Sequence, residues 1–290
     1  MATNTPFGQR LGLVLEGGAM RGIYTAGVLD VFLEAGIMPD VVVGVSAGAL
    51  HGCSYVAGQK GRSIRYYRKY RSDKHFMGLY SLLTTGDVVG TKFCYEDIPL
   101  RLDPFNEAAF EKAPVDFYVT VTNVRTGKPE YILCDELKVG SKMDVIRAGA
   151  SMPLCSKMVE WNGNLYLDGG VSDSIPYAKT KDFDCRKSIV VLTQPAGYLK
   201  QPAAMAPFEA MYRKYPAFVE AMRGRDQMYN TEVCAVEQAA KQGDVFLIRP
   251  SKLLHVGRME HDIEVLNAQY ELGRQDARNQ MDAMREWMER

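Results

Sequence analysis

The stretch VVVGVSAGAL, residues 41–50, places a serine between two glycines directly after an apolar run. The β-branched residues of this run indicate a buried strand, and residues 49–58 suit a helix that ends at Gly58. A strand-to-helix turn this sharp leaves little room beside the serine, so residues without side chains, Gly44 and Gly48, flank it. The pattern therefore predicts that Ser46 is presented at the carboxyl edge of a sheet, at the beginning of a helix.

The segments around this turn repeat the same alternation. LGLVLEGG at 11–18 indicates a buried strand followed by a tight turn, and residues 22–36 keep helical spacing. Strand, helix, strand and helix within 60 residues favour a parallel sheet covered on both faces. Further strands are expected at 116–124, 131–135, 158–170 and 188–195, whereas residues 59–104 interrupt the rhythm. We expect one core, formed by residues 10–200, with a mostly helical C-terminal extension at 201–290 that includes a late strand.

Composition excludes several classes of protein. Lysine plus arginine and aspartate plus glutamate each number 35, so the balanced charge gives no reason to expect a nucleic acid partner. The six cysteines are scattered without a CxxC pair, which indicates reduced thiols rather than disulfides or a zinc site. The polar N-terminus lacks the apolar core of a secretory signal, and no run of about 18 apolar residues could span a membrane. We therefore expect a cytoplasmic protein.

A serine nucleophile needs a base and a pocket that stabilises an anion. None of the four histidines follows a predicted strand end, where a catalytic triad would place one: His51, His75, His255 and His261. Asp168 is a better candidate, because it closes the apolar strand at 165–167 and the glycines 169 and 170 permit close backbone approach. An aspartate within hydrogen-bonding distance can accept the serine proton directly. The simpler interpretation of Asp-Gly-Gly is an ordinary turn.

A third small-residue segment, Gly17-Gly18-Ala19-Met20-Arg21-Gly22, lies between the first expected strand and helix. Consecutive small residues at that position let several backbone N–H groups converge, as an oxyanion hole or a phosphate-binding loop requires. The segment does not fit the dinucleotide-binding pattern and lacks the P-loop lysine. A structural tight turn would explain it nearly as well.

Together and in order, the three segments resemble the motifs of the patatin-like phospholipase family. The matching stretches are EGGAMRG (16–22), GVSAG (44–48) and DGG (168–170), supported by ASMP (150–153). The resemblance covers residues 10–195, and YELGRQDA at 270–277 resembles the C-terminal extension of a bacterial subgroup of the family.

This resemblance implies a three-layer α/β/α fold with a mainly parallel sheet, and hydrolysis of lipid acyl esters without a metal or organic cofactor. It implies that Ser46 is the nucleophile and Asp168 the proton acceptor, without a histidine. Backbone N–H groups of the loop would form the oxyanion hole, and Arg21 would anchor it. The implied oxyanion residues are Gly17, Gly18, Ala19 and Met20, and the remaining motif positions are Arg21, Gly22, Gly44, Gly48, Gly169 and Gly170.

The chain departs from the family pattern at Ala19, where the family has a third glycine. A methyl group at a turn that needs an unusual φ costs about 1 kcal/mol or more, or changes the loop. Two other hypotheses stand beside the hydrolase, and Ala19 bears on the second. One is an acyltransferase, in which another acceptor resolves the acyl-enzyme. The other is a lipid- or partner-binding protein with a weak or silent site.

The stretch RSIRYYRKYRSDKHF, residues 62–76, carries six basic residues against one acid, with aromatic residues between them. A solvated helix with a few core aromatics would explain it. The alternative is a positively charged aromatic rim that meets anionic lipid headgroups, continued by a lid. On that hypothesis the protein contacts the inner face of the membrane peripherally.

Overall fold

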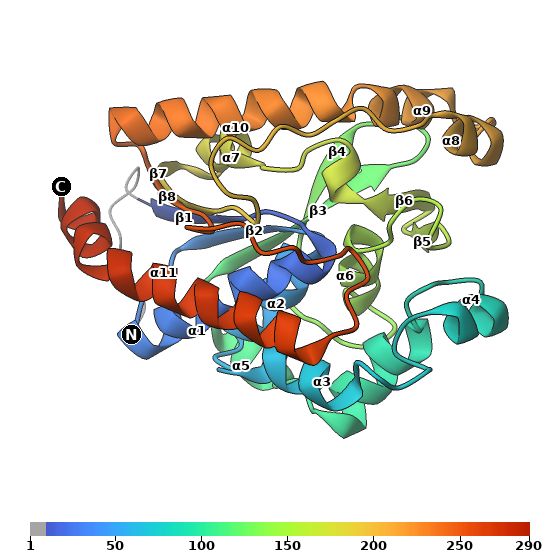
Figure 1. The fold of residues 1–290 in the computed structure, drawn as a ribbon, viewed down its shortest axis with the longest axis horizontal. Coiled ribbons are helices and arrows are strands. Elements are labelled where there is room, and N and C mark those ends of the chain that lie inside the picture. Colours follow the sequence, from blue (N-terminus) through green and yellow to red (C-terminus); the bar gives the residue numbers. More distant parts are fainter. Residues whose placement is uncertain (1–9) are drawn as a thin grey trace.

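A computed structural model describes residues 10–290 of the protein (Figure 1). The prediction that the N-terminus carries no secretory signal concerns residues 1–9, which lie outside the described residues. A central sheet lies between two groups of helices, which gives three layers, α/β/α. The expected fold class is confirmed.

The sheet has the strand order β5-β6-β3-β2-β1-β7-β8, with β4 also paired to β3. Its strands are β1 (Arg10–Leu15), β2 (Val41–Val45), β3 (Asp116–Asn123), β4 (Pro129–Leu133), β5 (Val159–Trp161), β6 (Asn164–Asp168), β7 (Cys185–Val191) and β8 (Val245–Ile248). The five strands from β3 through β8 in this order are parallel, whereas β4, β5 and β6 form antiparallel pairs. The strands expected at 116–124 and 131–135 form the antiparallel pair β3–β4, and the segment expected at 158–170 forms the pair β5–β6. The antiparallel pairing of β6 with β3 joins them.

Both faces of the sheet are buried, and β1 shows why. Leu13 and Leu15 pack into the core cluster that contains α1, α2 and α11. Val14, which points to the opposite face, packs with α7 and α10. Because successive side chains of a strand alternate between faces, a strand covered on both sides must be apolar throughout, as LVL is.

The helices cover these two faces in two groups, with α7 and α10 on one side of the sheet and α1, α2 and α11 on the other (Figure 1). Their bounds are α1 (Ile23–Ala35), α2 (Ala47–Val56), α3 (Arg62–Tyr70), α4 (Leu79–Thr85), α5 (Glu107–Lys112), α6 (Met143–Gly149), α7 (Tyr177–Thr180), α8 (Ala206–Met211), α9 (Pro216–Arg223), α10 (Arg225–Gln242) and α11 (Ile263–Glu289). Short 3₁₀ turns follow at Ala19–Gly22, Gly169–Val171 and Lys181–Phe183. No helix of residues 10–290 is long and apolar enough to cross a membrane.

The interrupting segment 59–104 folds as helices that stand apart from the sheet. It contains α3, α4 and a π-helix at Phe93–Leu102 that includes Pro99. Proline inside a helix removes a backbone donor, which explains why the sequence shows no regular helical signal there.

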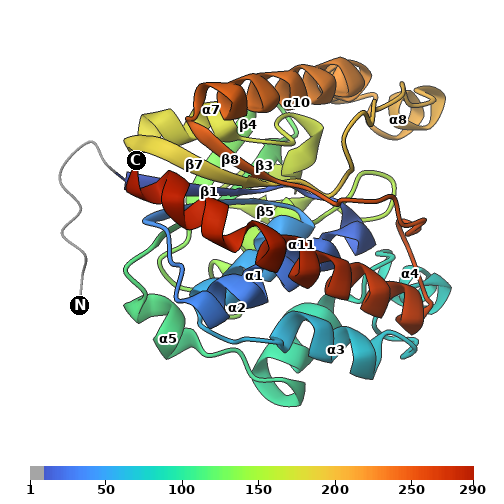
Figure 2. The same cartoon turned by 60° about the vertical axis from the view of Figure 1, so that its left-hand side comes forward.

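The C-terminal extension is joined to the same core. Strand β8 pairs in parallel with β7, and α11 crosses α1 (Figure 2). The crossing is unusually close, since a Cβ on Gly27 would lie 2.1 Å from the Tyr270 carbonyl oxygen and a Cβ on Gly273 would lie 2.1 Å from that of Tyr24. The division of the chain at residue 200 stays a prediction.

Two reciprocal tyrosine–aspartate hydrogen bonds join α1 and α11 beside this crossing. The Tyr24 hydroxyl donates to Asp276 Oδ2 at 3.1 Å, and the Tyr270 hydroxyl donates to Asp30 Oδ2 at 2.5 Å. Each helix thus supplies one tyrosine and one aspartate to the other, and the buried polar groups are satisfied across the contact.

We predict that Gly273→Ala destabilises the protein by about 3 kcal/mol, because its methyl group meets backbone and forces the helices apart. Chemical denaturation would measure the change. Gly224→Ala is the matched control: Gly224 has φ −83°, and its nearest neighbour to an added Cβ is 3.8 Å away. Equal effects of the two substitutions would contradict the close crossing.

Candidate active site

The turn after β2 is as sharp as the sequence predicts. Ser46 has φ 53° and ψ −123°, a conformation that L-residues rarely adopt. It occupies the N-cap position of α2. The packing explains the flanking glycines. A Cβ on Gly48 would lie 2.3 Å from the Leu15 carbonyl oxygen, and one on Gly44 would lie 2.5 Å from the Cα of Ala49. Larger residues would displace α2 from the sheet.

Strand β3 brings Ser46 and Asp168 together. Its successive residues Thr120 and Val121 pair with Val45, at the end of β2, and with Asp168, at the end of β6. The Ser46 hydroxyl donates to Asp168 Oδ2 at 2.6 Å, although the two residues are 122 positions apart in the chain. The structure thus joins the two polar side chains that the sequence singles out at separate strand ends.

The carboxylate of Asp168 is held on both oxygens. The backbone N–H of Gly170 donates to Oδ1 at 2.8 Å, while Ser46 occupies Oδ2. A side chain on Gly169 would collide with the Thr120 carbonyl oxygen, since its Cβ would lie 2.2 Å away. Burial raises the pKa of Asp168 above its ordinary value, against the hydrogen bond from Ser46 and the charge of Arg225, which lower it. A carboxylate with a raised pKa is a stronger proton acceptor.

The small-residue loop at 16–22 lies directly against the serine. A Cβ on Gly17 would be 2.7 Å from the Cβ of Ser46, and one on Gly22 would be 2.6 Å from that of Ala47. No hydrogen bond joins the backbone N–H of Gly18 to another residue of the described chain. An unpaired N–H donor beside the hydroxyl is what an oxyanion hole requires.

Ala19 begins the 3₁₀ turn of this loop with φ 49°, in the left-handed region. The unusual φ considered for this position is therefore present, although the residue carries a methyl group. Ala19 and Met20 line the cavities beside Ser46, and Met20 is buried. The Arg21 side chain lines a polar pocket, and its Nε is buried without a hydrogen-bond partner in the described structure.

Histidine takes no part in the contacts of Ser46 within residues 10–290. His51 is buried, and neither of its ring nitrogens has a hydrogen-bond partner. Burial lowers the pKa of His51 to about 3, so the ring is neutral at physiological pH. Its role is to pack α2 against Tyr67, whose ring centroid is 6.2 Å away.

Two cavities of opposite character meet at Ser46. The first, called here the apolar cavity, is bounded by α2, α3, α6 and the segment 76–105. Its lining is largely hydrophobic and includes Met20, Leu50, Tyr66, Tyr67, Phe76, Met77, Val89, Tyr95, Ile98, Phe105, Met143, Ile146 and Met152. An apolar cavity that opens on a nucleophile suits a hydrocarbon chain.

The second, called here the cationic pocket, lies on the side of Asp168. It is lined by Glu16, Gly17, Gly18, Ala19, Arg21, Val45, Ser46, Asp168, Gly170, Ser174, Lys200, Arg225, Tyr229 and Arg258. Sequence analysis does not single out Lys200, Arg225 or Arg258. Each is one basic residue among many in the C-terminal part, and no local spacing marks it.

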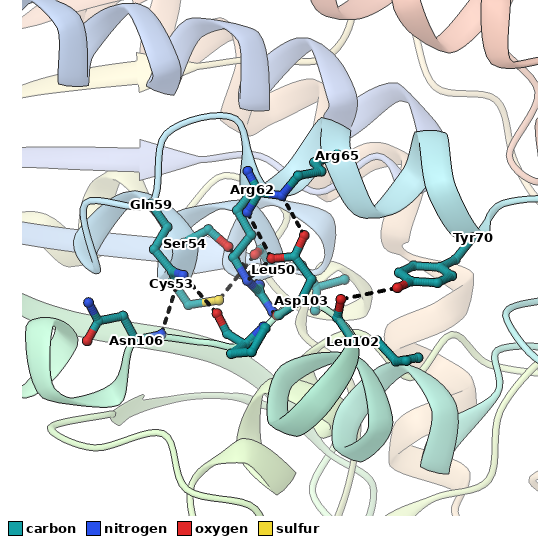
Figure 3. Close-up of polar contacts among 11 residues, drawn as sticks. Leu50, Cys53, Ser54, Gln59, Arg62, Arg65, Tyr70, Leu102, Asp103 and Asn106 are labelled. Carbon is teal, nitrogen blue, oxygen red and sulfur yellow. Dashed lines mark hydrogen bonds and ion pairs between the residues drawn. The ribbon is translucent and has the colours of Figure 1, made fainter.

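The basic stretch 62–76 has both buried and exposed basic residues: Arg62 and Arg71 are buried, whereas Arg65, Arg68, Lys69 and Lys74 are exposed. Contact of this stretch with anionic lipid headgroups stays a prediction. Arg62 donates to Ser54 Oγ at 3.1 Å and to the Asp103 carbonyl oxygen at 2.9 Å, while Arg65 binds both carboxylate oxygens of Asp103, at 2.7 and 2.8 Å (Figure 3). Arg71 is 1% exposed and donates to two carbonyl oxygens of the segment before α11. These arginines hold α3 in place, and the aromatic residues between them line the apolar cavity.

Among residues 10–290, no group of three or more histidine, cysteine, aspartate or glutamate side chains is arranged to hold a metal ion.

Comparison with known families matches two parts of the chain. Residues 13–180 match the family "Patatin-like phospholipase", and residues 215–289 match a domain of unknown function, DUF6363. In solved structures, VipD from Legionella pneumophila matches with TM-score 0.46 and 12% identity, covering 96% of this chain and 67% of that chain.

Curated relatives include a bacterial protein and fungal lysophospholipases. The uncharacterized protein YjjU of Escherichia coli is 28% identical over 273 residues, which cover 91% of this chain and 75% of that protein. Lysophospholipase nte1 of Aspergillus terreus is 30% identical and lysophospholipase NTE1 of Saccharomyces cerevisiae 29%, over 59% and 63% of this chain. The aligned part spans 11% of each fungal protein. Because the matched residues 13–180 make up more than half of the chain, it belongs to the patatin-like phospholipase family.

Proposed function

We propose that the protein is a serine hydrolase of lipid acyl esters, in which Ser46 is the nucleophile and Asp168 the general base. The observation that carries this proposal is the 2.6 Å hydrogen bond from Ser46 Oγ to Asp168 Oδ2, beside an apolar cavity. Family membership and the lysophospholipases among the relatives support a lipid substrate.

The reaction proceeds in two half-reactions. Ser46 Oγ attacks the ester carbonyl carbon as its proton moves to Asp168 Oδ2, and the carbonyl oxygen takes the negative charge. The tetrahedral intermediate collapses, the ester C–O bond breaks, and the leaving alcohol takes the proton from Asp168. Water then attacks the acyl-enzyme and gives its proton to Asp168. Collapse of the second intermediate releases the carboxylic acid and returns the proton to Ser46.

The oxyanion is assigned to backbone N–H groups of the loop, with Gly18 and Ala19 as the donors. Both residues line the same pocket as Ser46, which supports this assignment, and backbone donors survive the replacement of glycine by alanine. The cost of Ala19 is therefore strain rather than loss of a donor. A left-handed non-glycine residue costs about 1–3 kcal/mol.

Contact with a lipid surface is proposed through α4. Leu79 and Leu83 are 69% and 76% exposed, and the Lys74 ammonium lies 4.6 Å from the ring centroid of Tyr80 beside them. Residues 77 and 89, which bracket α4 and pair with each other, line the apolar cavity. The exposed leucines therefore lie next to the wall of the cavity that a lipid chain would enter, and we place this contact at the inner face of the membrane.

We predict that a fluorophosphonate probe labels the native protein and that Ser46→Ala and heat denaturation both abolish the label. Asp168→Asn is expected to lower ester hydrolysis by about 10³-fold or more while the fold is retained, because an amide still satisfies Gly170 but cannot accept the proton. Gel fluorescence and soluble-ester hydrolysis measure the two effects.

The pH profile of the wild type provides a second measure of Asp168. Activity requires the carboxylate, so it is lost as the pH falls through a pKa raised above the ordinary aspartate range.

A native protein that takes up no fluorophosphonate label would favour a binding protein with a silent site. Label with transfer of the acyl group to an alcohol, and without release of free acid, would favour an acyltransferase.

We predict that Ala19→Gly stabilises the protein by about 1 kcal/mol, because glycine adopts positive φ without strain. Denaturant titration measures this change, and soluble-ester hydrolysis shows whether the loop limits the rate. Ala108→Gly, in α5, is the control with the opposite sign, since glycine inside a helix costs about 0.5–1 kcal/mol. A loss of stability in Ala19→Gly would contradict strain at this position.

We predict that the double variant Leu79→Ser/Leu83→Ser binds anionic vesicles at least tenfold more weakly, because two leucines no longer enter the lipid. Vesicle co-sedimentation measures binding, and hydrolysis of a soluble ester checks the integrity of the site. Met38→Ser removes an exposed apolar residue, 40% exposed, from the loop that precedes β2. Equal losses in both proteins would exclude α4 as the contact.

A further inference from the structure

The cationic pocket holds more positive charge than the proposed chemistry uses. Four basic side chains line it, Arg21, Lys200, Arg225 and Arg258, together with two acidic ones, Glu16 and Asp168. Even with both acids ionised, four positive charges against two negative charges leave a net charge of +2. None of the four basic residues forms an ion pair within residues 10–290.

The two carboxylates are already engaged elsewhere. Glu16 accepts the backbone N–H of Thr193 at 2.6 Å, and the Tyr229 hydroxyl also hydrogen-bonds to it. Asp168 accepts from Ser46 and from Gly170. Burial raises the pKa of both acids, so the folded pocket disfavours their negative charge. Neither carboxylate therefore serves as a dedicated counterion for the basic cluster.

The basic groups destabilise one another. Burial, with the charge of Arg225 next, lowers the pKa of Lys200 to about 8, against the charge of Glu16. Burial also lowers the pKa of Arg225; the charge of Asp168 opposes this, and Arg258 and Arg21 add to it. Arg21 also keeps a buried Nε without a hydrogen-bond partner in the described structure. A bound anion would relieve this repulsion and supply the missing acceptor.

Polar contacts hold two members of the cluster, Arg225 and Lys200, in place, whereas Arg258 is exposed at the rim of the pocket. Arg225 begins α10, and its Nε donates to the Gly170 carbonyl oxygen at 2.5 Å, which ties it to the turn after Asp168. Lys200 is fixed by Asn230, whose side chain accepts from the Lys200 N–H at 2.9 Å and donates to its carbonyl oxygen at 3.1 Å. The C-terminal part thus positions cations beside the catalytic serine before any ligand is bound.

We propose that the cationic pocket binds a phosphate group on the leaving-alcohol side of the substrate, and that Lys200, Arg225 and Arg258 make the enzyme prefer net-anionic lipids to neutral ones. This inference rests on the proposed function. The apolar cavity takes the acyl chain, the ester carbonyl lies at Ser46, and the phosphate lies on the side of Asp168. A phosphate monoester carries up to two negative charges, which match the excess of the pocket.

The test compares two substrates that differ only in the phosphate: 1-acylglycerol and 1-acylglycerol 3-phosphate. In the wild type, kcat/KM is expected to be higher for the phosphate. In Lys200→Gln and Arg258→Gln this preference falls about tenfold to hundredfold, the loss expected when one hydrogen bond to a charged group is removed. Arg213→Gln and Lys252→Gln, which remove exposed charges outside the pocket, keep the wild-type preference.

Inorganic phosphate separates a lipid headgroup from free phosphate as the ligand. A thermal shift with millimolar phosphate in the wild type that is absent in both pocket variants supports phosphate binding in the pocket. If this shift is seen but the two lipids are hydrolysed equally, the ligand of the pocket is free phosphate and not a lipid headgroup. If the wild type shows no preference between the two lipids and no thermal shift with phosphate, the proposal is overturned. Fluorophosphonate labelling of Ser46 stands apart from both measurements, so failure of the hydrolase proposal and failure of the pocket are distinguishable.

Discussion

The backbone strain at Ser46 is the constraint on which the site depends. A serine at φ 53° persists only where the surrounding packing over-determines it. Here α2 presses its first turn onto the end of β1 through Gly48, and Gly17 presses on the serine from the other side. The same close packing sets the loop at 16–22 against Ser46, while the register of β3 delivers Asp168. The geometry of the site is therefore a by-product of how tightly this edge of the sheet is packed.

The parts that could be predicted from the sequence are those in which the requirement is local. A strained residue at a strand-to-helix turn needs small residues beside it in the sequence. The glycines around Ser46 and in the loop at 16–22 therefore allow both positions to be predicted from the sequence. The carboxylate at Asp168 is visible as a strand end. That these two side chains meet is not visible, because the meeting depends on which neighbours β3 accepts. The order of the family motifs supplied that link.

Other features depend on partners far away in the chain. Arg62 and Arg65 look like a solvated charged face until Asp103, about 40 residues later, is placed beside them. The cationic pocket is assembled from six segments, and three of its four basic residues, Lys200, Arg225 and Arg258, stand in no pattern that a single sequence would mark. The π-helix around Pro99 breaks the ordinary helical period, so no periodicity could predict the wall that it gives to the apolar cavity.

The glycine contact between α1 and α11 ties the two family-matched parts of the chain to each other. Helix α1 continues directly from the loop at 16–22, and Gln269 of α11 donates to the Arg21 carbonyl oxygen at 3.4 Å. The C-terminal part is therefore unsuited to exchange as an independent module. A replacement from a relative would have to bring its own glycine to the crossing, or the loop beside the serine would move. A change of side chain on either helix at this crossing therefore acts on both parts of the chain.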